Sequence, residues 1–386
     1  MRNQTKYTAH YGAIQSFYWL TNMPILAFGP MYLYSLGLSN IAVGFFLAAA
    51  SLASIFLQPW VGSLIDKEKL TLRQAVFLHV GALFVLAILL NLPLPSIKVG
   101  AHFVALVVIM GLQPFVNTLS IDAVHSGISL DFGVARGIAS LMYGIVSLLL
   151  GRALGIYDTS LIPLVVLVFL SLFTLVFWRF PKTVSSQGIA ETSPAISIGR
   201  NRPFLIMLFA TFFLFVNHGT LNNYLLRIVE NVGGGAKEFG IALGIAAAIE
   251  LPIMASFTRL RNRFGTVDLL RLSSTFFLIK AILLVFADSP TLLYINQLLQ
   301  LLTFGLYFPS AVTYVQEILP FSQRARSQAL LVSTMTLGGV VASLLGGAII
   351  DYLSVQALLI NGVIFSALGF FAILLLKEKQ SPKALR

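Results

Sequence analysis

The sequence predicts an all-α integral membrane protein in which twelve transmembrane helices form two pseudo-symmetric six-helix bundles. Three observations predict this class: an apolar composition, twelve long apolar segments, and similar features in the two halves of the chain. Of the 386 residues, 58% are hydrophobic and only 10% are charged, whereas a soluble domain carries about 25% charged residues. The lipid bilayer is therefore the expected solvent for most of this chain.

A helix that crosses a bilayer needs about 20 mostly apolar residues. The chain offers twelve such segments, at 11–35, 41–65, 74–95, 99–122, 134–156, 160–179, 203–228, 239–258, 268–287, 290–317, 327–350 and 355–376. The polar break between the first two segments is short, and we expect a hairpin on the outer side there. An even number of segments places both ends of the chain on the same side of the membrane.

The basic residues predict which side that is. Most of the 25 Lys and Arg residues lie at one set of segment ends, together with both termini. The exceptions are Lys98, Arg152, Arg227 and Lys237 at the opposite ends, and Arg136 and Lys280 inside segments. Because cytoplasmic loops carry the excess of Lys and Arg, we expect both termini in the cytoplasm. The net charge of +11 is then a topology signal, and we expect no nucleic-acid partner.

A polar interval, "RFPKTVSSQGIAETSPAISIGRNRP", separates the sixth segment from the seventh. Its Ser, Thr, Pro and Gly content is typical of a linker. We therefore expect an N-terminal six-helix bundle at 1–180, a cytoplasmic linker at 181–202, a C-terminal six-helix bundle at 203–376 and a cytoplasmic tail at 377–386.

The two halves share local features. Pro114 in the fourth segment is followed about two helical turns later by Asp122, and Pro309 in the tenth segment is followed at the same spacing by Glu317. Internal similarity of this kind is typical of duplicated transporters. Small residues at helix-packing spacing occur in the fifth, eighth and eleventh segments: Gly151 and Gly155; Gly240, Gly244 and Ala248; Gly339, Ser343 and Gly347.

Four ionisable residues lie inside segments or one turn from an end: Asp122, Arg136, Glu250 and Lys280. Ionisable groups inside a membrane are costly and usually functional. One interpretation makes them a substrate and proton site, in which Glu250 binds and releases the coupling proton. The other makes them buried pairs that hold helices together, such as a permanent ion pair of Glu250 with Lys280, or a rim gate to which Glu317 and Arg326 also belong.

The loop after the second segment contains Gly62, Asp66 and Lys67, with Arg73 further on. Together with the twelve segments, the division into six and six and the cytoplasmic central interval, this loop resembles the major facilitator superfamily. The family's loop motif survives only in part, because its second glycine and paired arginines are missing. The resemblance implies that these four residues belong to a cytoplasmic gate or loop motif.

A narrower resemblance rests on "LASIFLQPWVGSLIDK", "LDFGVARGIASLMYG" and "AAAIELPIMASF". These stretches resemble the oligosaccharide:proton symporters, typified by lactose permease, and the bacterial sugar efflux transporters. The resemblance implies that Asp122 and Arg136 contact sugar hydroxyls, that Tyr143 stacks on the sugar ring, and that Glu250 couples transport to protons. Lys280 occupies the place of a family arginine.

The chain also departs from the symporter pattern. Gln300 and Thr303 stand about where the symporters have a histidine and a glutamate, and "NHGTLNNY" (217–224) replaces two acids of the seventh segment. Glu250 is then the main candidate for a titrating group.

Uncharged polar residues add to the candidate substrate site, because carbohydrate offers many hydroxyls and weakly apolar ring faces. The amide and imidazole side chains inside segments are Asn22, Asn217, His218, Asn222, Asn223, Asn296, Gln297 and Gln300. Tyr18, Trp19 and Tyr143 are the accompanying aromatic residues. Hydrogen bonds between helices are the alternative explanation for these polar groups.

The sequence thus predicts a secondary active transporter, coupled to protons, that moves a sugar or related small polar solute by alternating access. The alternative is a proton-coupled exporter of drugs or amphipathic aromatic compounds, which the 31 phenylalanines would suit. The sequence has no HExxH, GxSxG or GxxxxGK[ST] motif and no cysteine. We therefore expect no enzyme activity, cofactor or metal. We also expect a multi-pass protein of the bacterial cytoplasmic membrane, and the resemblance implies a monomer.

Overall fold

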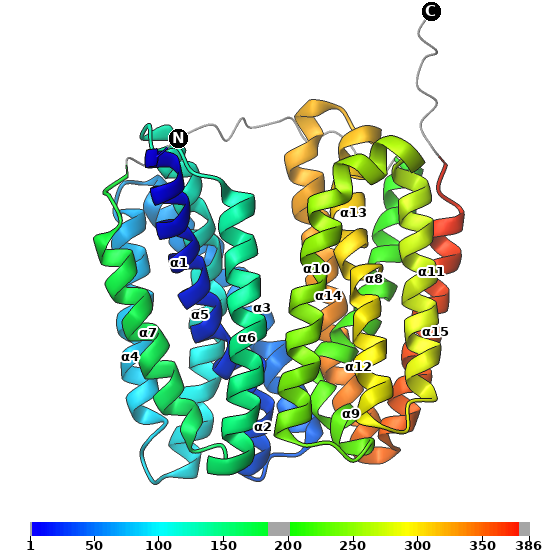
Figure 1. Cartoon of the computed structure of the whole chain (residues 1–386), viewed down its shortest axis with the longest axis horizontal. Coiled ribbons are helices and arrows are strands. Elements are labelled where there is room, and N and C mark those ends of the chain that lie inside the picture. Colours follow the sequence, from blue (N-terminus) through cyan, green and yellow to red (C-terminus); the bar gives the residue numbers. More distant parts are fainter. Residues whose placement is uncertain (1, 184–200, 378–386) are drawn as a thin grey trace, which may run out of the picture. The chain divides into compact units, whose positions relative to one another are not determined.

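The computed structural model describes residues 2–183 and 201–377. Every regular element in these two ranges is helical (Figure 1). The elements are α1 (Arg2–Leu26), α2 (Gly29–Ser35), α3 (Asn40–Asp66), α4 (Leu72–Leu89), α5 (Pro95–His125), α6 (Phe132–Tyr157), α7 (Leu161–Arg179), α8 (Arg202–Asn223), α9 (Leu225–Asn231), α10 (Ala236–Phe264), α11 (Thr266–Val285), α12 (Pro290–Leu298), η2 (Leu299–Leu301), α13 (Phe304–Ile318), α14 (Phe321–Tyr352) and α15 (Val355–Leu374). Most of the predicted linker and tail lies outside the described residues.

These elements follow the twelve predicted segments in order. Three segments are interrupted helices: α1 with α2, α8 with α9, and α12 with η2 and α13. Within the described ranges, nine helical segments are long and apolar enough to cross a membrane by length and composition alone. Helices α1, α10 and α11 are outside that set, and α10 and α11 each carry several charged residues. The predicted all-α, twelve-helix membrane architecture is confirmed.

Short polar side chains start several of the helices. The Ser39 hydroxyl accepts a hydrogen bond from the backbone N–H of Ala42 at the start of α3. Thr71 and Gln74 form a reciprocal capping box at the start of α4. Because the first turn of a helix has backbone N–H groups without helical partners, these caps fix where the apolar segments begin.

The described helices divide into two compact units. Unit 1 contains residues 1–191 together with 235–248, and unit 2 contains residues 192–234 together with 249–386. The first half of α10 therefore belongs to unit 1, and its second half, which begins directly before Glu250, belongs to unit 2. The finer domain limits that the sequence suggests stay a prediction.

Within unit 1, glycines bring α6 and the first half of α10 into backbone contact. A Cβ placed on Gly151 would lie 2.6 Å from the carbonyl oxygen of Ala236 and 2.8 Å from the Cα of Gly240. A Cβ on Gly244 would lie 2.9 Å from the carbonyl oxygen of Gly144. Since real side chains do not fit at these distances, the small residues are what allows the two helices to pack this closely.

Helix α1 is the buried centre of unit 1 and packs against α5, α6 and α7. Its residues Tyr11, Ile14 and Tyr18 are almost completely buried. The two tyrosine hydroxyls donate hydrogen bonds to carbonyl oxygens of α5, Tyr11 to Val116 at 3.0 Å and Tyr18 to Ile109 at 3.1 Å. Buried polar groups in a membrane need such partners.

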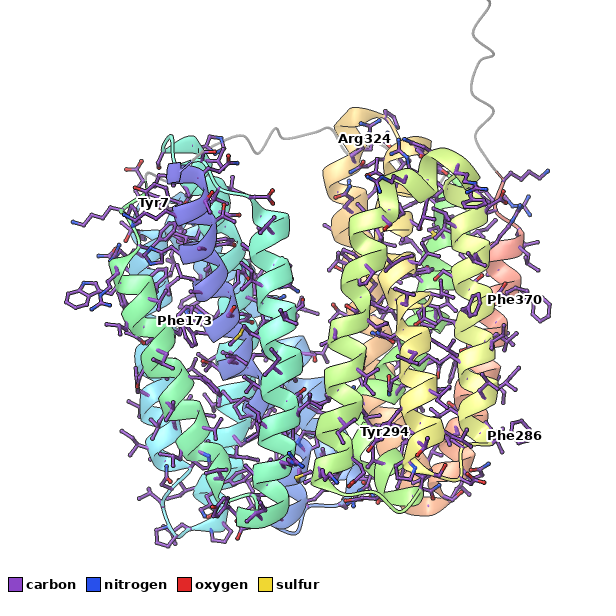
Figure 2. All side chains as sticks on the ribbon, viewed as in Figure 1. Tyr7, Phe173, Phe286, Tyr294, Arg324 and Phe370 are labelled. Atoms are coloured by element: carbon purple, nitrogen blue, oxygen red, sulfur yellow. The ribbon has the colours of Figure 1, made fainter. Side chains whose placement is uncertain are left out.

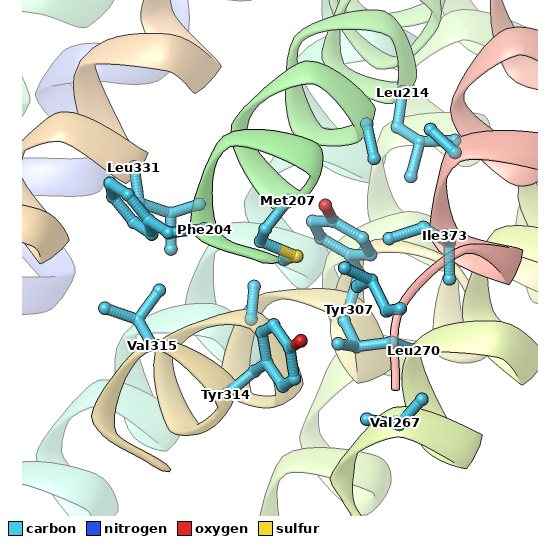
Figure 3. Packing of buried hydrophobic residues seen from close by; sticks show 14 of the residues in the cluster. Phe204, Met207, Leu214, Val267, Leu270, Tyr307, Tyr314, Val315, Leu331 and Ile373 are labelled. Atoms are coloured by element: carbon cyan, nitrogen blue, oxygen red, sulfur yellow. The ribbon is translucent and has the colours of Figure 1, made fainter. Parts of the chain in front are cut away.

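Unit 2 has a continuous apolar core formed by α8, α11, α13, α14 and α15 (Figure 3). Phe204 and Met207 of α8, Tyr307 and Tyr314 of α13, and Ile373 of α15 are buried members of this core. The Tyr307 hydroxyl is satisfied by a 2.8 Å hydrogen bond with Thr211.

Large apolar side chains also cover the outer surface of each unit. Figure 2 shows Phe286 and Phe370 pointing outward from unit 2, and Phe286 is 73% exposed. In unit 1, Phe56 and Trp178 are comparably exposed. Exposed apolar surface on this scale would be unfavourable in water, so the outer surface is suited to lipid.

Candidate functional site

A cluster of polar side chains lies inside unit 2, where α10, α11 and η2 meet. The Gln300 amide donates a 3.0 Å hydrogen bond to Oε1 of Glu250, and its carbonyl oxygen accepts a 2.7 Å hydrogen bond from Nζ of Lys280. Gln300 thus links the carboxylate to the ammonium group. The sequence left open a permanent ion pair of Glu250 with Lys280. In the structure, the hydrogen bonds of the Lys280 ammonium group go to glutamine side chains.

The surroundings of Lys280 are polar but closed to solvent. Lys280 is 4% exposed and Gln300 is 5% exposed. Nζ of Lys280 also lies 3.4 Å from Oε1 of Gln297, and the Asn296 amide donates to the carbonyl oxygen of Lys280 at 2.8 Å. Three of the predicted polar residues therefore surround one buried charge, as a membrane interior requires.

The break between α12 and α13 positions Gln300. The 3₁₀ turn η2 is followed by Thr303, whose carbonyl oxygen accepts a 3.0 Å hydrogen bond from the Ser273 hydroxyl of α11. Gly305 then allows α13 to approach α10, because a Cβ on this residue would lie 2.8 Å from Ile253 and 3.7 Å from the Cα of Glu250. Irregular backbone at this depth is typical of transporter sites.

An aromatic cluster lies beside α8 in the same unit. His218 stacks on Phe304 with ring centroids 4.9 Å apart, and Phe215 and Phe277 make further ring contacts. The His218 imidazole is also 2.9 Å from the amide nitrogen of Asn222, which is exposed.

Two other predicted polar residues of α8 hold helices together. The Asn217 amide donates a 2.7 Å hydrogen bond to Ser366 of α15, and the Asn223 amide donates a 2.7 Å hydrogen bond to Ser343 of α14. A Cβ on Gly362 would lie 2.5 Å from Oδ1 of Asn217, so this asparagine is packed tightly against α15.

In unit 1, a second polar cluster forms around Trp19 of α1. The Arg136 guanidinium lies over the Trp19 ring, 4.5 Å from its centroid, and Tyr18 packs edge-on against the same ring. Asn22 is buried one turn further along α1. Tyr143 follows Arg136 by about two turns on α6, and so lies on the same side of that helix.

Gln15 of α1 and Asn117 of α5 lie beside this cluster and were not predicted from the sequence. The Gln15 amide donates hydrogen bonds to the Tyr11 hydroxyl at 2.6 Å and to Oδ1 of Asn117 at 3.1 Å. Gln15 is completely buried, and it lies one helical turn before Trp19. Its position one turn before Trp19, inside the first predicted segment, was the available signal.

Asp122 of α5 lines a cavity of unit 1. It is 1% exposed and lines a cavity of about 500 Å³ at the ends of α4, α5 and α7, together with Arg73. The Arg73 guanidinium donates hydrogen bonds to the carbonyl oxygens of Phe180 at 3.1 Å and Trp178 at 2.5 Å. Asp122 therefore lines the same cavity as Arg73, a residue of the predicted loop motif.

The other predicted gate residues lie at helix ends. Gly62 lies in the last turns of α3, and Lys67 is the exposed C-cap residue of that helix. The side chain of Asp66 lies outside the described part of the structure. Oε1 of Glu317 accepts a 2.7 Å hydrogen bond from Thr266 at the start of α11, and Arg326 is exposed on α14.

A family model described as "MFS_1 like family" matches residues 16–360. The chain belongs to this family of the major facilitator superfamily. It is 27% identical over 357 residues to a maltose permease of Geobacillus stearothermophilus, covering 89% of this chain and 87% of the permease. It is 25% identical over 382 residues to the uncharacterized transporter YwbF of Bacillus subtilis (strain 168), covering 97% and 95% of the two chains.

Solved structures show the same fold as this major facilitator chain. A crystal structure of the nucleoside transporter NupG matches with a TM-score of 0.79 at 13% identity, covering 98% of this chain and 100% of that one. At this identity the likeness concerns the fold alone. The MFS_1 like chain is thus a multi-pass membrane transporter of a small-molecule substrate.

Within the described ranges, no group of three or more His, Cys, Asp or Glu side chains could hold a metal ion. The polar clusters that the structure does contain consist of amides, aromatic rings and a few charges. Amides and aromatic rings hydrogen-bond to and stack on polar solutes.

Proposed function

We propose that this chain is a proton-coupled secondary transporter that moves a sugar or a related small polar solute by alternating access. It acts as a monomer in the bacterial cytoplasmic membrane, with both termini in the cytoplasm. The observation that carries the proposal is the linked group of Glu250, Gln300 and Lys280, a carboxylate and an ammonium group joined by one amide inside unit 2.

The linked group supports proton coupling for a physical reason. A carboxylate inside a membrane protein has two states of very different electrostatic energy, charged and neutral. When Glu250 binds a proton, the Gln300 amide donates to a neutral carboxyl group instead of a carboxylate. Lys280 keeps its charge, so the net charge of the linked side chains becomes positive. Conformational states that stabilise the two forms differently would then respond to the proton gradient.

The cluster around Trp19 supports a polar, sugar-like substrate. Sugar recognition combines an aromatic face with hydrogen-bonding groups for hydroxyls, and this cluster offers the Trp19 ring, the Arg136 guanidinium and nearby amides. Asn22, Tyr143, His218, Asn222, Gln297 and Gln300 complete the proposed set of substrate-binding residues. The maltose permease among the relatives supports the same substrate class.

The remaining predicted residues are assigned to the cytoplasmic rim. We place Gly62, Asp66, Lys67, Arg73, Glu317 and Arg326 in a gate or loop motif, and we add Asp122 because it shares a cavity with Arg73. Asn217 is left to helix packing because of its hydrogen bond to Ser366.

The test is solute flux in proteoliposomes that contain the purified full chain. A panel of mono- and disaccharides is assayed by counterflow and by proton-driven accumulation, for wild type and Glu250→Gln. We expect saturable exchange of at least one sugar in both proteins, with accumulation lost in the variant. If no sugar moves in either protein, the sugar proposal fails.

A second candidate, a proton-coupled exporter of drugs or amphipathic aromatic compounds, is favoured by the ring cluster of His218, Phe304, Phe215 and Phe277. Flat aromatic compounds would stack on such rings. The same proteoliposomes discriminate between the two, because export of aromatic cations without any sugar exchange would support the second candidate.

A further inference from the structure

The Gln15 side chain of α1 is held in one orientation by its neighbours. Its amide nitrogen donates hydrogen bonds to the Tyr11 hydroxyl at 2.6 Å and to Oδ1 of Asn117 at 3.1 Å. The Tyr11 hydroxyl gives its own proton to the carbonyl oxygen of Val116. If the Gln15 amide were turned over, its oxygen would meet a hydroxyl oxygen that has no proton left to donate. The hydrogen-bond network therefore fixes where the Gln15 oxygen lies.

The side-chain oxygen of Gln15 is buried without a hydrogen-bond donor. Gln15 is 0% exposed, and its Oε1 accepts no hydrogen bond from any residue within 2–183 and 201–377. The two N–H groups of the amide are used, whereas the oxygen still offers its lone pairs. A buried acceptor that is left unpaired costs free energy. A ligand group that donates a proton to this oxygen would recover that free energy.

One helical turn further along α1, the Trp19 indole presents the opposite kind of group. Its Nε1–H is buried and finds no acceptor in the described part of the chain. The Arg136 guanidinium over the ring and the edge-on Tyr18 ring hold the indole in place. Residues four apart on a helix lie on the same face, with Cβ atoms about 5–6 Å apart. One face of α1 therefore carries a buried acceptor and a buried donor side by side.

A neutral solute with hydroxyl groups matches this pair of atoms better than an ion does. A hydroxyl group both donates and accepts hydrogen bonds, so one polyhydroxyl solute satisfies the Gln15 oxygen and the Trp19 N–H together. A metal ion or an ammonium group cannot accept the Trp19 N–H, and a fully ionised anion has no proton for the Gln15 oxygen. The two atoms therefore select for hydroxyl groups.

We propose that Gln15 determines which sugar is bound: one hydroxyl of the transported sugar donates to Oε1 of Gln15, and the Trp19 Nε1–H donates to an oxygen of the same sugar. The inference rests on the proposed sugar transport and adds the residue that requires a hydroxyl at one position of the sugar ring. Tyr11 and Asn117 are positioning residues, because they fix the orientation of the Gln15 amide.

The first test is sugar exchange in proteoliposomes that contain the full chain, with D-glucose, maltose and the monodeoxy derivatives of D-glucose. We expect Gln15→Leu to raise the half-saturation concentration for glucose about tenfold, because a buried sugar hydroxyl loses its acceptor. One deoxy derivative binds wild type about tenfold more weakly than glucose does, yet binds Gln15→Leu as well as glucose does. Ser16→Ala is the matched control and leaves these values unchanged, since the buried Ser16 hydroxyl donates to the Gly12 carbonyl oxygen within α1.

The second test needs no Gln15 variant, because Gln15→Leu also removes the hydrogen bonds to Tyr11 and Asn117. The exposed Trp60 and Trp178 are replaced with phenylalanine, so that Trp19 is the one remaining tryptophan. Ultraviolet resonance Raman spectra of this full chain in detergent report the hydrogen bonding of the indole N–H. We expect glucose or maltose to strengthen that hydrogen bond. In the exchange assay, Trp19→Phe raises the half-saturation concentration only about twofold, because the aromatic face remains.

The outcomes separate this inference from the proposed transport. If sugar is exchanged but every deoxy derivative loses affinity equally in wild type and Gln15→Leu, the role of Gln15 is refuted and sugar transport stands. An indole N–H that is hydrogen-bonded to the same extent with and without sugar would assign the two atoms to a bound water only, which also overturns the inference. A sugar-dependent Trp19 spectrum without exchange would support the binding site and refute transport. If no sugar is exchanged and none alters the spectrum, both fail.

Discussion

Replacing Gln300 with leucine removes the residue that links Glu250 to Lys280. Leucine is similar in size but has no polar atom, so two hydrogen bonds are lost, at 3.0 Å to the carboxylate and 2.7 Å from the ammonium group. Lys280 then keeps the 3.4 Å contact with Gln297. Hydrogen bonds to charged groups contribute about 1.5–3 kcal/mol each, whereas bonds between membrane helices contribute about 0.6–2 kcal/mol.

From these ranges we expect Gln300→Leu to lower the free energy of unfolding by about 2–4 kcal/mol. The matched control is Gln297→Leu, one turn earlier, which loses only a long contact to the same ammonium group and costs less than about 1 kcal/mol. Reversible unfolding in mixed micelles, followed by circular dichroism, measures both. Equal destabilisation of the two variants, or a neutral Gln300→Leu, would refute the idea that Gln300 stabilises the buried charge.

Three further predictions concern other parts of the chain. Gly151→Ala destabilises unit 1 by about 1–3 kcal/mol, because the new methyl would lie 2.6 Å from the Ala236 carbonyl oxygen. Gly155→Ala is the control and is neutral or stabilising, because a Cβ there meets no neighbouring atom within 4 Å. Thermal unfolding measures the stability of both variants. Trp19→Ala raises the half-saturation concentration for sugar exchange about tenfold through loss of the aromatic face, whereas Trp19→Phe retains most of the affinity. Asn217→Ala lowers the free energy of unfolding by about 1 kcal/mol and changes the half-saturation concentration for sugar exchange little. A large change in the half-saturation concentration would show that Asn217 belongs to the substrate-binding site.

The apolar pattern predicted the fold because a bilayer requires long apolar helices whatever their neighbours are. The same pattern could not locate every helix end. Helix α1 begins at Arg2, before the first apolar segment, because polar residues can continue a helix without a hydropathy signal. The break at η2 was also missed, since it depends on contacts such as that of Ser273 with the Thr303 carbonyl oxygen.

The candidate site was predictable residue by residue but not as an arrangement. Glu250, Lys280 and Gln300 each stood out as polar groups in apolar surroundings, yet which of them touch depends on how three helices are rotated and packed. The sequence could not tell that an amide links the two charges. Nor could it separate Asn217, which bonds to Ser366, from asparagines and glutamines that surround Lys280.

The most direct test of the central claim is the pH change that accompanies sugar movement. Sugar is added to unbuffered proteoliposomes of wild type and Glu250→Gln without an imposed proton gradient, and the external pH is recorded with a dye. The account predicts a sugar-dependent pH change in wild type that is abolished by an uncoupler and absent in the variant, although sugar exchange persists there. A variant that moves protons with sugar as wild type does would contradict the account.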